Sequence, residues 1–398
     1  MAQAMLKKVR INNFLSCQDT EIELNDVTAL IGRNAAGKSN ILKAIQWCAQ
    51  FAVGNASLHG HLSQFDTIKT ACNIEFLIND ETFKYEIRIT RKSPGLGFAS
   101  IGKKEGAVLI EKLSCYINDE WLLVADREDI CVTHYNEEAI NVEINAEIAM
   151  ISSLLALLPK KRLNPTINKV FNYLSEIKYY TLEIDQYENG ALGKYSLIIF
   201  NSEYEEWLSK NNKSELSVVM RLLHLWHEDK DLLEEIEALV GKNGLNLIDN
   251  IVISKSSFGQ QDENLFYVVN FNVADTTVSY TQLSYGTQRV LTLLLALLYD
   301  KNSTLLIEQP EDGIHSGLLK KLLPLCFEYA AVYNRQLIIA THSPEVINLL
   351  PPESIRLVRM TENGTKASSL DEERIPFILN YIENEGALFD FIESLDDE

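Results

Sequence analysis

The stretch that decides the fold is Ala29–Leu42, which reads ALIGRNAAGKSNIL. Gly32 and Gly37 are spaced as G-x-x-x-x-G-K-S, the pattern of a loop whose backbone N–H groups wrap phosphates. In that pattern Lys38 reaches the β- and γ-phosphate oxygens, and the Ser39 hydroxyl binds Mg²⁺. The loop follows an apolar run and precedes apolar residues at helical spacing. The stretch therefore predicts a strand, a phosphate-binding loop and a helix whose positive N-terminal end faces the anion.

Composition limits the classes of partner. The chain has 398 residues, of which 36 are basic and 56 acidic, so its net charge is −20. This excess of negative charge disfavours broad electrostatic binding to nucleic acid but leaves room for a local basic patch. The densest basic cluster, 160–162, is read as a solvated turn ahead of Pro165 rather than as a nucleic-acid contact. Nucleic acid is therefore a partner that the sequence permits but does not favour.

The cysteines and the hydropathy favour a reduced, cytoplasmic compartment. The six cysteines lack C-x-x-C spacing, and some lie beside core residues, which is typical of free structural thiols. The longest strongly apolar run, 290–299, has about half the length that a bilayer span needs. The N-terminus lacks the apolar core of a secretory signal. We therefore predict a cytoplasmic protein without membrane insertion.

Changes of periodicity divide the chain into five segments. We predict a nucleotide-binding core made of 1–78 and 245–368, which is split by a β-rich lobe, 79–201, and a helical insertion, 202–244. A single helical patch, 151–158, interrupts the lobe. The last segment, 369–398, is predicted as a helical acidic tail. Its apolar residues, Leu388, Phe389, Phe391 and Ile392, are read as packing on their own domain, with partner docking as the alternative.

A second anion-binding element is predicted at 283–289, which reads LSYGTQR and precedes the helical run 290–298. Ser284 is a typical helix cap, and Gly286 leaves the helix N-terminus free of side-chain obstruction. Alone, this pattern is usually only a cap. Together with the phosphate loop it indicates a second phosphate contact.

Two further strand ends carry polar residues. The apolar run 304–307 ends at Glu308. A carboxylate at the end of a parallel strand, beside the strand that carries the phosphate loop, is placed to bind Mg²⁺. The run 336–340 ends near His342, whose neutral imidazole can donate a hydrogen bond to a γ-phosphate or to the attacking water. We therefore predict Ser39 and Glu308 as metal ligands and His342 as a catalytic residue.

Together these elements resemble the head domain of the ATP-binding-cassette group that includes SMC and RecF proteins, and more narrowly the OLD-like ATPases of prokaryotes. The resemblance covers both ends of the chain. It rests on the Walker A region 9–40, the signature loop 283–288, the Walker B strand 306–311 and the switch histidine in 340–344. It implies an α/β fold: an ABC-type (SMC/RecF-like) P-loop ATPase head with an antiparallel β lobe and an inserted helical subdomain.

The resemblance also implies ATP and Mg²⁺ as cofactors and a homodimer or higher oligomer. In such heads each nucleotide lies between the Walker A loop of one subunit and the signature loop of the other, and hydrolysis reopens the pair. The implied nucleotide contacts are Gly32, Arg33, Asn34, Ala35, Ala36, Gly37, Lys38, Ser39, Asn40, Ser284, Gly286 and Gln288. The implied catalytic residues are Lys38, Glu308, Gln309 and His342.

Gln309 departs from the family pattern, which usually has an acidic residue directly after the Walker B carboxylate. An amide orients water but cannot accept its proton, so we expect slow hydrolysis. Three explanations stay open. The first is a natural clamp that hydrolyses ATP slowly, the second is another residue, such as Glu311 or His342, that activates the water, and the third is an original glutamate exchanged for Gln309 by engineering. Ala35 stands where the loop often has glycine, and Gln64 is a bare suggestion for the glutamine that senses Mg²⁺.

The expected role is that of a sensor subunit. Too few residues follow His342 for the acidic metal-binding domain of an OLD nuclease, so we do not expect intrinsic nuclease activity. The large insertion fits a transporter subunit poorly. The resemblance then implies an ATPase of a prokaryotic anti-phage system with a separately encoded nuclease or toxin. The alternative is a DNA-repair or chromosome-maintenance ATPase that clamps duplex DNA.

Overall fold

The computed structural model describes residues 4–56, 69–91, 107–136, 138–145, 147–181, 198–209, 217–257, 265–300 and 302–396. Gln64 lies outside these described residues. The chain forms two compact units. The first unit comprises Met1–Tyr180, Asn302–Gln309 and Ala330–Glu398, and the second unit comprises Thr181–Lys301 and Pro310–Tyr329.

The first unit contains a six-stranded sheet in the order β10-β15-β16-β3-β17-β18. Its strands are β3 (Val27–Ile31), β10 (Ile177–Tyr180), β15 (Thr304–Glu308), β16 (Gln336–Thr341), β17 (Ile355–Thr361) and β18 (Gly364–Ser369). All neighbouring pairs are parallel except β17 with β18. The strands predicted before the phosphate loop, at 304–307 and at 336–340 are confirmed. Their unbroken apolar runs suit parallel strands that are buried on both faces.

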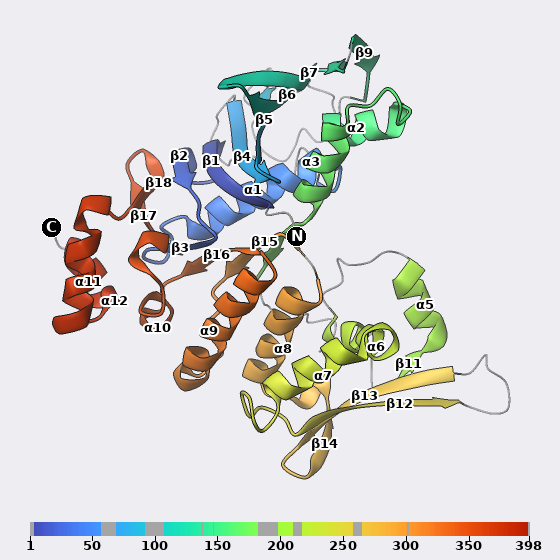
Figure 1. Cartoon of the computed structure of the whole chain (residues 1–398), viewed down its shortest axis with the longest axis vertical. Coiled ribbons are helices and arrows are strands. Elements are labelled where there is room, and N and C mark those ends of the chain that lie inside the picture. Colours follow the sequence, from blue (N-terminus) through green and yellow to red (C-terminus); the bar gives the residue numbers. More distant parts are fainter. Residues whose placement is uncertain are drawn as a thin grey trace, which may run out of the picture. The chain divides into compact units, whose positions relative to one another are not determined.

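One predicted neighbour relation is wrong. β15 does not lie beside β3, because β16 pairs with both of them. Figure 1 shows blue β3 among the orange and red strands of the chain's second half. An apolar run fixes which residues form a strand, but the crossover connections decide its place in the sheet.

A second sheet of the first unit has eight antiparallel strands in the order β2-β1-β4-β5-β6-β7-β8-β9. They are β1 (Ala4–Phe14), β2 (Cys17–Glu23), β4 (Lys69–Ile78), β5 (Glu81–Arg91), β6 (Ala107–Ile117), β7 (Glu120–Glu128), β8 (Cys131–Tyr135) and β9 (Ala139–Glu143). Two-residue turns join β4 to β5 and β6 to β7. All four turn residues, Asn79, Asp80, Asn118 and Asp119, have φ between 51° and 65°. This left-handed backbone is the one that type I′ hairpin turns require.

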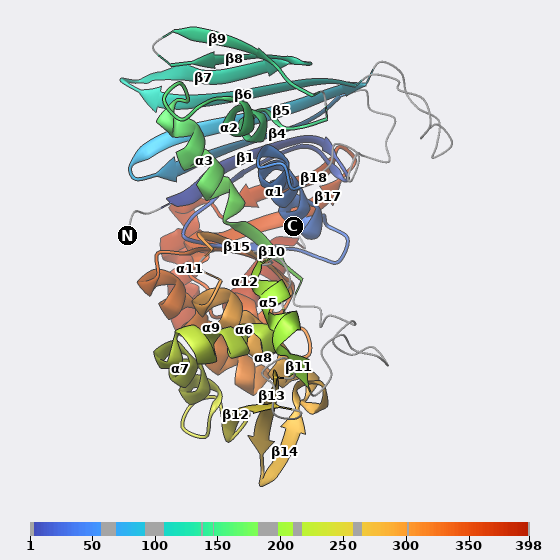
Figure 2. The same cartoon turned by 90° about the vertical axis from the view of Figure 1, so that its right-hand side faces the viewer.

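Helix α1 (Lys38–Ala52) lies between the two sheets and contacts strands of both. Two further helices, α2 (Met150–Leu157) and α3 (Pro165–Ser175), cover the same face of the antiparallel sheet (Figure 2). The ring of Tyr173 on α3 stacks at 5.2 Å on Phe76 of β4. These contacts build one continuous apolar core around α1.

The sequence predicted only one helix in this region. The patch at 151–158 is confirmed as α2, whereas α3 was missed. The signal for α3 is present: Asn164 caps the helix by accepting a hydrogen bond from the backbone N–H of Thr166, and Pro165 occupies its first turn. The basic cluster 160–162 is an exposed turn before this helix, as predicted.

The second unit combines helices with a small antiparallel sheet. Its helices are α5 (Asn201–Ser209), α6 (Val218–Glu228), α7 (Lys230–Val240) and α8 (Tyr285–Leu298), together with most of α9 (Ser316–Val332). Its strands are β11 (Ile199–Phe200), β12 (Asn250–Ser257), β13 (Leu265–Val273) and β14 (Thr276–Ser279). The helical pattern predicted within 202–244 is confirmed. Arg221 of α6 forms a buried ion pair at 3.0 Å with Asp300, just after α8.

Three short helices complete the C-terminal part: α10 (Pro344–Ile347), α11 (Ile375–Asn384) and α12 (Leu388–Asp396). The apolar side chains Leu388, Phe391 and Ile392 of α12 are only 2%, 8% and 5% exposed. They pack on the first unit, as predicted. In the described part of the chain, no helix combines the length and apolar character needed to cross a bilayer.

A buried ion pair ties the antiparallel sheet to α2. Glu111 of β6 and Arg127 of β7 are 0% and 1% exposed, and a guanidinium nitrogen lies 2.7 Å from a carboxylate oxygen. Glu111 also accepts hydrogen bonds from the Tyr85 hydroxyl and from the backbone N–H of Met150, at the start of α2. Burial raises the pKa of the Glu111 carboxyl, whereas Tyr85 and Arg127 oppose that shift.

We predict that Arg127→Met lowers the free energy of unfolding by about 3–5 kcal/mol, because it leaves a buried carboxylate without its charge partner. The pKa of Glu111 should rise further in the folded protein. A carboxyl whose pKa is higher in the folded than in the unfolded state lowers the free energy of unfolding as pH increases. The loss measured by urea unfolding should therefore shrink at acidic pH. Lys8→Met, which removes a surface partner of Glu21, is the control and should cost about 0–1 kcal/mol. Equal losses in the two variants would contradict the prediction.

Candidate nucleotide site

The loop between β3 and α1 lies in close contact with strands β17 and β18. Gly37 has φ 104°, and a Cβ atom there would lie 2.0 Å from the Thr365 hydroxyl oxygen. A Cβ atom at Gly32 would lie 2.1 Å from the backbone oxygen of Val358. Both glycines are therefore needed on steric grounds. Ala35 has φ 64°, a left-handed conformation that costs a residue with a Cβ atom about 1–2 kcal/mol and explains why glycine is frequent there.

Lys38, the first residue of α1, folds back over this loop. Its ammonium group donates to the backbone oxygens of Gly32 at 2.6 Å and Arg33 at 3.0 Å. The side chain is 8% exposed. These bonds hold one positive charge at the loop that the sequence predicts to bind phosphate.

Ser39 and Glu308 meet, as the predicted metal site requires. The Ser39 hydroxyl donates to one carboxylate oxygen of Glu308, and the Tyr179 hydroxyl donates to the other. Tyr179 comes from β10, which pairs with β15. Sequence reasoning missed Tyr179, because a tyrosine in a short strand carries no motif.

This donor set fits Mg²⁺. Within the described residues, no group of three or more histidine, cysteine or acidic side chains is arranged to hold a metal ion. Mg²⁺ suits a site of this kind, because it is commonly held by one or two protein oxygens and completes its shell with water and phosphate oxygens. A serine hydroxyl and a single carboxylate at the phosphate loop are such oxygens.

Gln309 and His342 follow the adjacent strands β15 and β16. Gln309 has φ 47°, and its backbone N–H donates to the backbone oxygen of Ala340 at 2.8 Å. A left-handed glutamine at a strand end is strained, and such strain gathers at functional sites. His342 is exposed at the end of β16. Glu311, considered as a substitute base, belongs to the second unit.

A chain of polar groups that the sequence did not reveal supports the loop. The buried Thr365 hydroxyl donates to the backbone oxygen of Ala36 at 3.0 Å and shares a 2.7 Å hydrogen bond with the Ser16 hydroxyl. The Asn40 amide donates to the same Ser16 oxygen at 2.7 Å. The turn between β1 and β2 and the start of β18 thus brace the loop. Burial raises the pKa of the neighbouring Cys17 thiol to about 11, so it stays protonated at neutral pH.

The signature-like residues lie in the second unit. Ser284 caps α8, as predicted, and its hydroxyl accepts from the backbone N–H of Thr287 at 3.2 Å. A Cβ atom at Gly286 would lie 2.8 Å from the backbone oxygen of Gly313, so this position also requires glycine. Gln288 differs from expectation. It is 3% exposed and donates to the backbone oxygen of Tyr280 at 2.7 Å, which favours a structural role over nucleotide contact.

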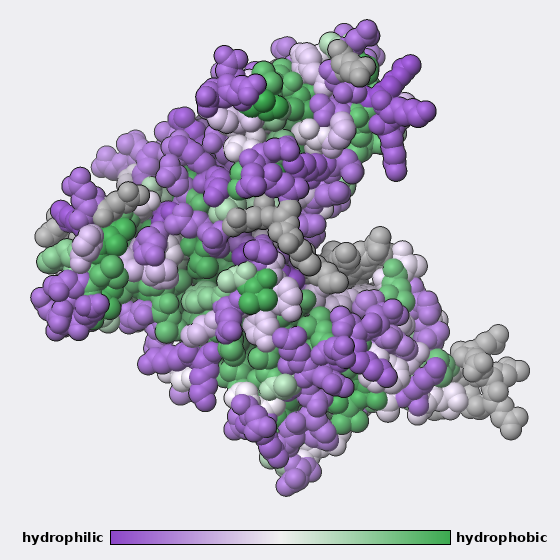
Figure 3. Space-filling view, in the orientation of Figure 1, coloured by the Kyte–Doolittle hydropathy of each residue, from purple (hydrophilic) through white to green (hydrophobic). Residues whose placement is uncertain are grey.

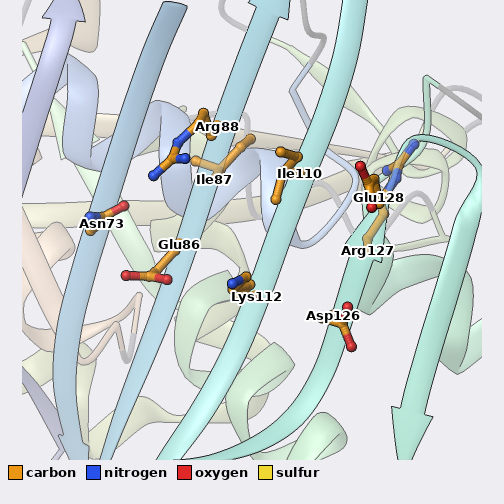
Figure 4. Close-up of a pocket in the computed structure, with 9 residues that line it drawn as sticks. All are labelled: Asn73, Glu86, Ile87, Arg88, Ile110, Lys112, Asp126, Arg127 and Glu128. Atoms are coloured by element: carbon orange, nitrogen blue, oxygen red, sulfur yellow. The ribbon is translucent and has the colours of Figure 1, made fainter.

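A separate pocket of about 280 Å³ opens on the antiparallel sheet, on strands β4 to β7 (Figure 4). Its lining mixes cations with carboxylates: Asn73, Glu86, Ile87, Arg88, Ile110, Lys112, Asp126, Arg127 and Glu128. None of the predicted site residues lines it. Charges of both signs give it no preference for a polyphosphate, so the loop is the candidate nucleotide site.

A glycine-framed loop before a helix, with a serine and a strand-end carboxylate beside it, defines a P-loop nucleotide-binding protein. The chain belongs to the family described as "AAA domain, putative AbiEii toxin, Type IV TA system", whose model matches residues 27–348.

Two curated relatives match most of this chain. An ATP/GTP phosphatase of Helicobacter pylori is 24% identical over an alignment of 366 positions that covers 87% of this chain and 87% of that protein. An OLD nuclease of Thermus scotoductus is 23% identical over an alignment of 401 positions that covers 97% of this chain and 68% of that protein. The predicted membership of the OLD-like ATPases and the predicted α/β fold with an antiparallel lobe are confirmed.

Among solved structures, the Smc head domain of Pyrococcus furiosus, with an extended coiled coil and bound to the C-terminal domain of ScpA, covers 96% of this chain. This chain covers 100% of that one, with 12% identity and a TM-score of 0.46.

We predict that Thr365→Val weakens the binding of Mg-ATP about 5- to 150-fold, because the Ala36 oxygen and the Ser16 hydroxyl lose a buried partner worth about 1–3 kcal/mol. Titration calorimetry measures the affinity. Thr365→Ser keeps the hydroxyl and should bind as the unchanged chain does.

Thr20→Val is the matched control. Thr20 is also buried, but its hydroxyl bonds to the backbone oxygen of Thr365 and not to the loop. The Thr20→Val variant should have a lower melting temperature but an unchanged affinity for Mg-ATP. If both valine variants alter stability alone, Thr365 does not support the loop.

Proposed function

We propose that the chain is an ATP-hydrolysing switch with a dimeric closed state. The observation that carries this proposal is the meeting of Ser39 with Glu308 beside a glycine-framed loop. The membership of an AAA family and the ATP/GTP phosphatase relative support it. In this proposal, segments 1–78 and 245–368 together form the ATPase core.

In this proposal the loop and its neighbours bind the phosphates and Mg²⁺. The backbone N–H groups of 32–40 would bind the phosphates, and the Lys38 ammonium would exchange its two carbonyl bonds for phosphate oxygens. Ser39 and Glu308 would hold Mg²⁺, with Tyr179 orienting the carboxylate. The ion would supply charge neutralisation on the phosphate oxygens.

Gln309 would orient the attacking water without accepting its proton. Its backbone bond to Ala340 holds the position whatever the side chain, so a glutamate there would occupy the same place. His342, which follows the neighbouring strand β16, would contact the γ-phosphate. Hydrolysis in this chain is therefore slow, and the closed state is long-lived.

Closure would bring a second copy to the same nucleotides. Ser284 and Gly286 would then contact the γ-phosphate bound by the partner, since the start of α8 combines a helix N-terminus with an unobstructed glycine. The γ-phosphate is the element that distinguishes closed from open, as in other nucleotide switches.

The biological role that we propose is that of a cytoplasmic sensor in an anti-phage system with a separately encoded nuclease or toxin. The family description names a toxin of a type IV toxin–antitoxin system, and the Thermus relative is an OLD nuclease. A net charge of −20 supports a protein partner better than nucleic acid.

We predict that Gln309→Glu raises the turnover number for ATP by about 10²- to 10⁴-fold, the usual contribution of a general base. Steady-state phosphate release measures the rate, and light scattering with Mg-ATP measures the mass. The unchanged chain should double its mass with Mg-ATP yet turn over slowly. Lys38→Ala is the negative control, and it should neither double its mass with Mg-ATP nor hydrolyse ATP. Ordinary turnover by the unchanged chain would transfer the role of base to Glu311 or His342.

We further predict that phage plating falls when the chain is expressed with the genes that flank it, and that Lys38→Ala restores plating. The lysine change removes the phosphate contact without touching any surface for a partner. Equal plating with and without the intact chain, over a panel of phages, would contradict the sensor role.

A further inference from the structure

The hairpin of β6 and β7 exposes a cluster of large apolar side chains. Tyr116, Ile117, Trp121, Leu122 and Leu123 are between 38% and 47% exposed. The rings of Tyr116 and Trp121 lie 5.2 Å apart. Figure 3 shows hydrophobic surface over the end of the lobe that carries these strands. Successive side chains of a strand alternate, so Tyr116, Trp121 and Leu123 share one face of the hairpin, and Ile117 and Leu122 share the other. Single exposed apolar residues are ordinary, but exposed apolar groups on both faces of one hairpin indicate an interaction surface.

The same hairpin has an open backbone edge. β7 pairs with β6 from Glu120 to Glu128 except at Val124, but with β8 only over Ala125–Glu128. The register with β6 shifts just before this point, and Val124 is the extra residue. In the described part of the chain, Trp121–Leu123 therefore pair on one side only. These three residues include no charge and no proline, the devices that usually protect an exposed edge.

The free backbone groups have a definite direction. A two-residue turn makes its flanking pair, Ile117 with Glu120, a hydrogen-bonded one. Bonded and non-bonded pairs then alternate along an antiparallel ladder. The N–H and C=O groups of Trp121 and Leu123 consequently point to the open edge, where a further strand would satisfy them.

We propose that this edge pairs with the same edge of a second copy, antiparallel and about a two-fold axis at Leu122. In this register Leu122 faces the partner's Leu122, and Trp121 faces the partner's Leu123. Facing residues share one face of a sheet, so the three central pairs of the new ladder are apolar on both sides. Glu120 faces the partner's Val124, and no like charges oppose each other. Such a self-complementary patch is what a two-fold interface requires.

The area of the patch sets the strength of the pairing. Five side chains at these exposures present roughly 400 Å² per copy, since a large side chain offers about 150–250 Å². Because Tyr116 and Ile117 lie on β6 and not at the open edge, the pair buries at most about 800 Å², which is below the range of about 1,200–2,000 Å² for stable complexes. The association is weak and depends on protein concentration.

This interface needs no nucleotide. If the proposed function also holds, two different interfaces act on one chain, and Mg-ATP converts a weak dimer into a tetramer or a longer assembly. Lys38→Ala separates the two proposals, because it removes only the nucleotide-dependent step.

Sedimentation velocity over a wide range of protein concentration tests the pairing, without nucleotide and with a reductant, because Cys131 is exposed. The unchanged chain should shift from monomer towards dimer as concentration rises. Leu122→Lys places two like charges on the axis and should stay monomeric. Val332→Lys makes the same change at a residue of α9 that is 65% exposed, and it should behave as the unchanged chain. Melting curves confirm that both variants fold.

A mixture of Leu122→Lys with Leu122→Glu provides the rescue, because opposite charges then meet on the axis. The mixture should associate, whereas each variant alone should not. A chain that stays monomeric at every concentration overturns the proposal. So does association that Leu122→Lys leaves unchanged.

Discussion

The contact between the Ser39 hydroxyl and the Glu308 carboxylate is the interaction on which the rest of the site depends. The two residues are far apart in sequence. In the sheet, β16 lies between β3, which leads to Ser39, and β15, which ends at Glu308. They meet because α1 starts above the carboxyl ends of the parallel strands, where β15 also ends. A hydroxyl oxygen and a carboxylate oxygen held in this way can supply two of the six ligands of an octahedral magnesium ion, and Tyr179 holds the remaining carboxylate oxygen. The parallel sheet thus serves to bring one residue from each half of the core to a single point.

The strained backbone at this site is held in place by hydrogen bonds from neighbouring segments. Ala35, Gly37 and Gln309 all have positive φ, a conformation that residues other than glycine adopt at a cost. The surrounding structure maintains it: Thr365 bonds to the loop at Ala36, and Ala340 accepts the backbone N–H of Gln309. The loop is therefore held by neighbours that contribute no chemistry of their own. This arrangement fixes the backbone of the loop before any ligand arrives.

The sequence was sufficient for the loop and for the parallel strands, because glycine spacing and unbroken apolar runs are local signals with a direct steric or hydrophobic cause. It failed where position depends on distant segments. The place of β16 between β15 and β3 is set by crossovers, and the support from Thr365 reaches Ser16 across 349 residues of sequence. Tyr179 and Thr365 are isolated polar residues whose importance lies only in what they touch. For Gln288 the motif did not reveal that the side chain is buried and donates to the backbone oxygen of Tyr280, because that contact depends on a neighbouring turn and not on the motif.

The place of β3 in the sheet has a consequence for synthesis. Its two neighbours, β16 and β17, come from residues 336–361, some 300 residues later. At roughly 5–20 residues per second, the ribosome needs about 15–60 s to supply them. Throughout this interval the emerging N-terminal segment has its phosphate loop but neither flanking strand, and Thr365 has not been made. The first motif translated is thus among the last to be completed, so a nascent or truncated chain cannot hold nucleotide as the finished protein does.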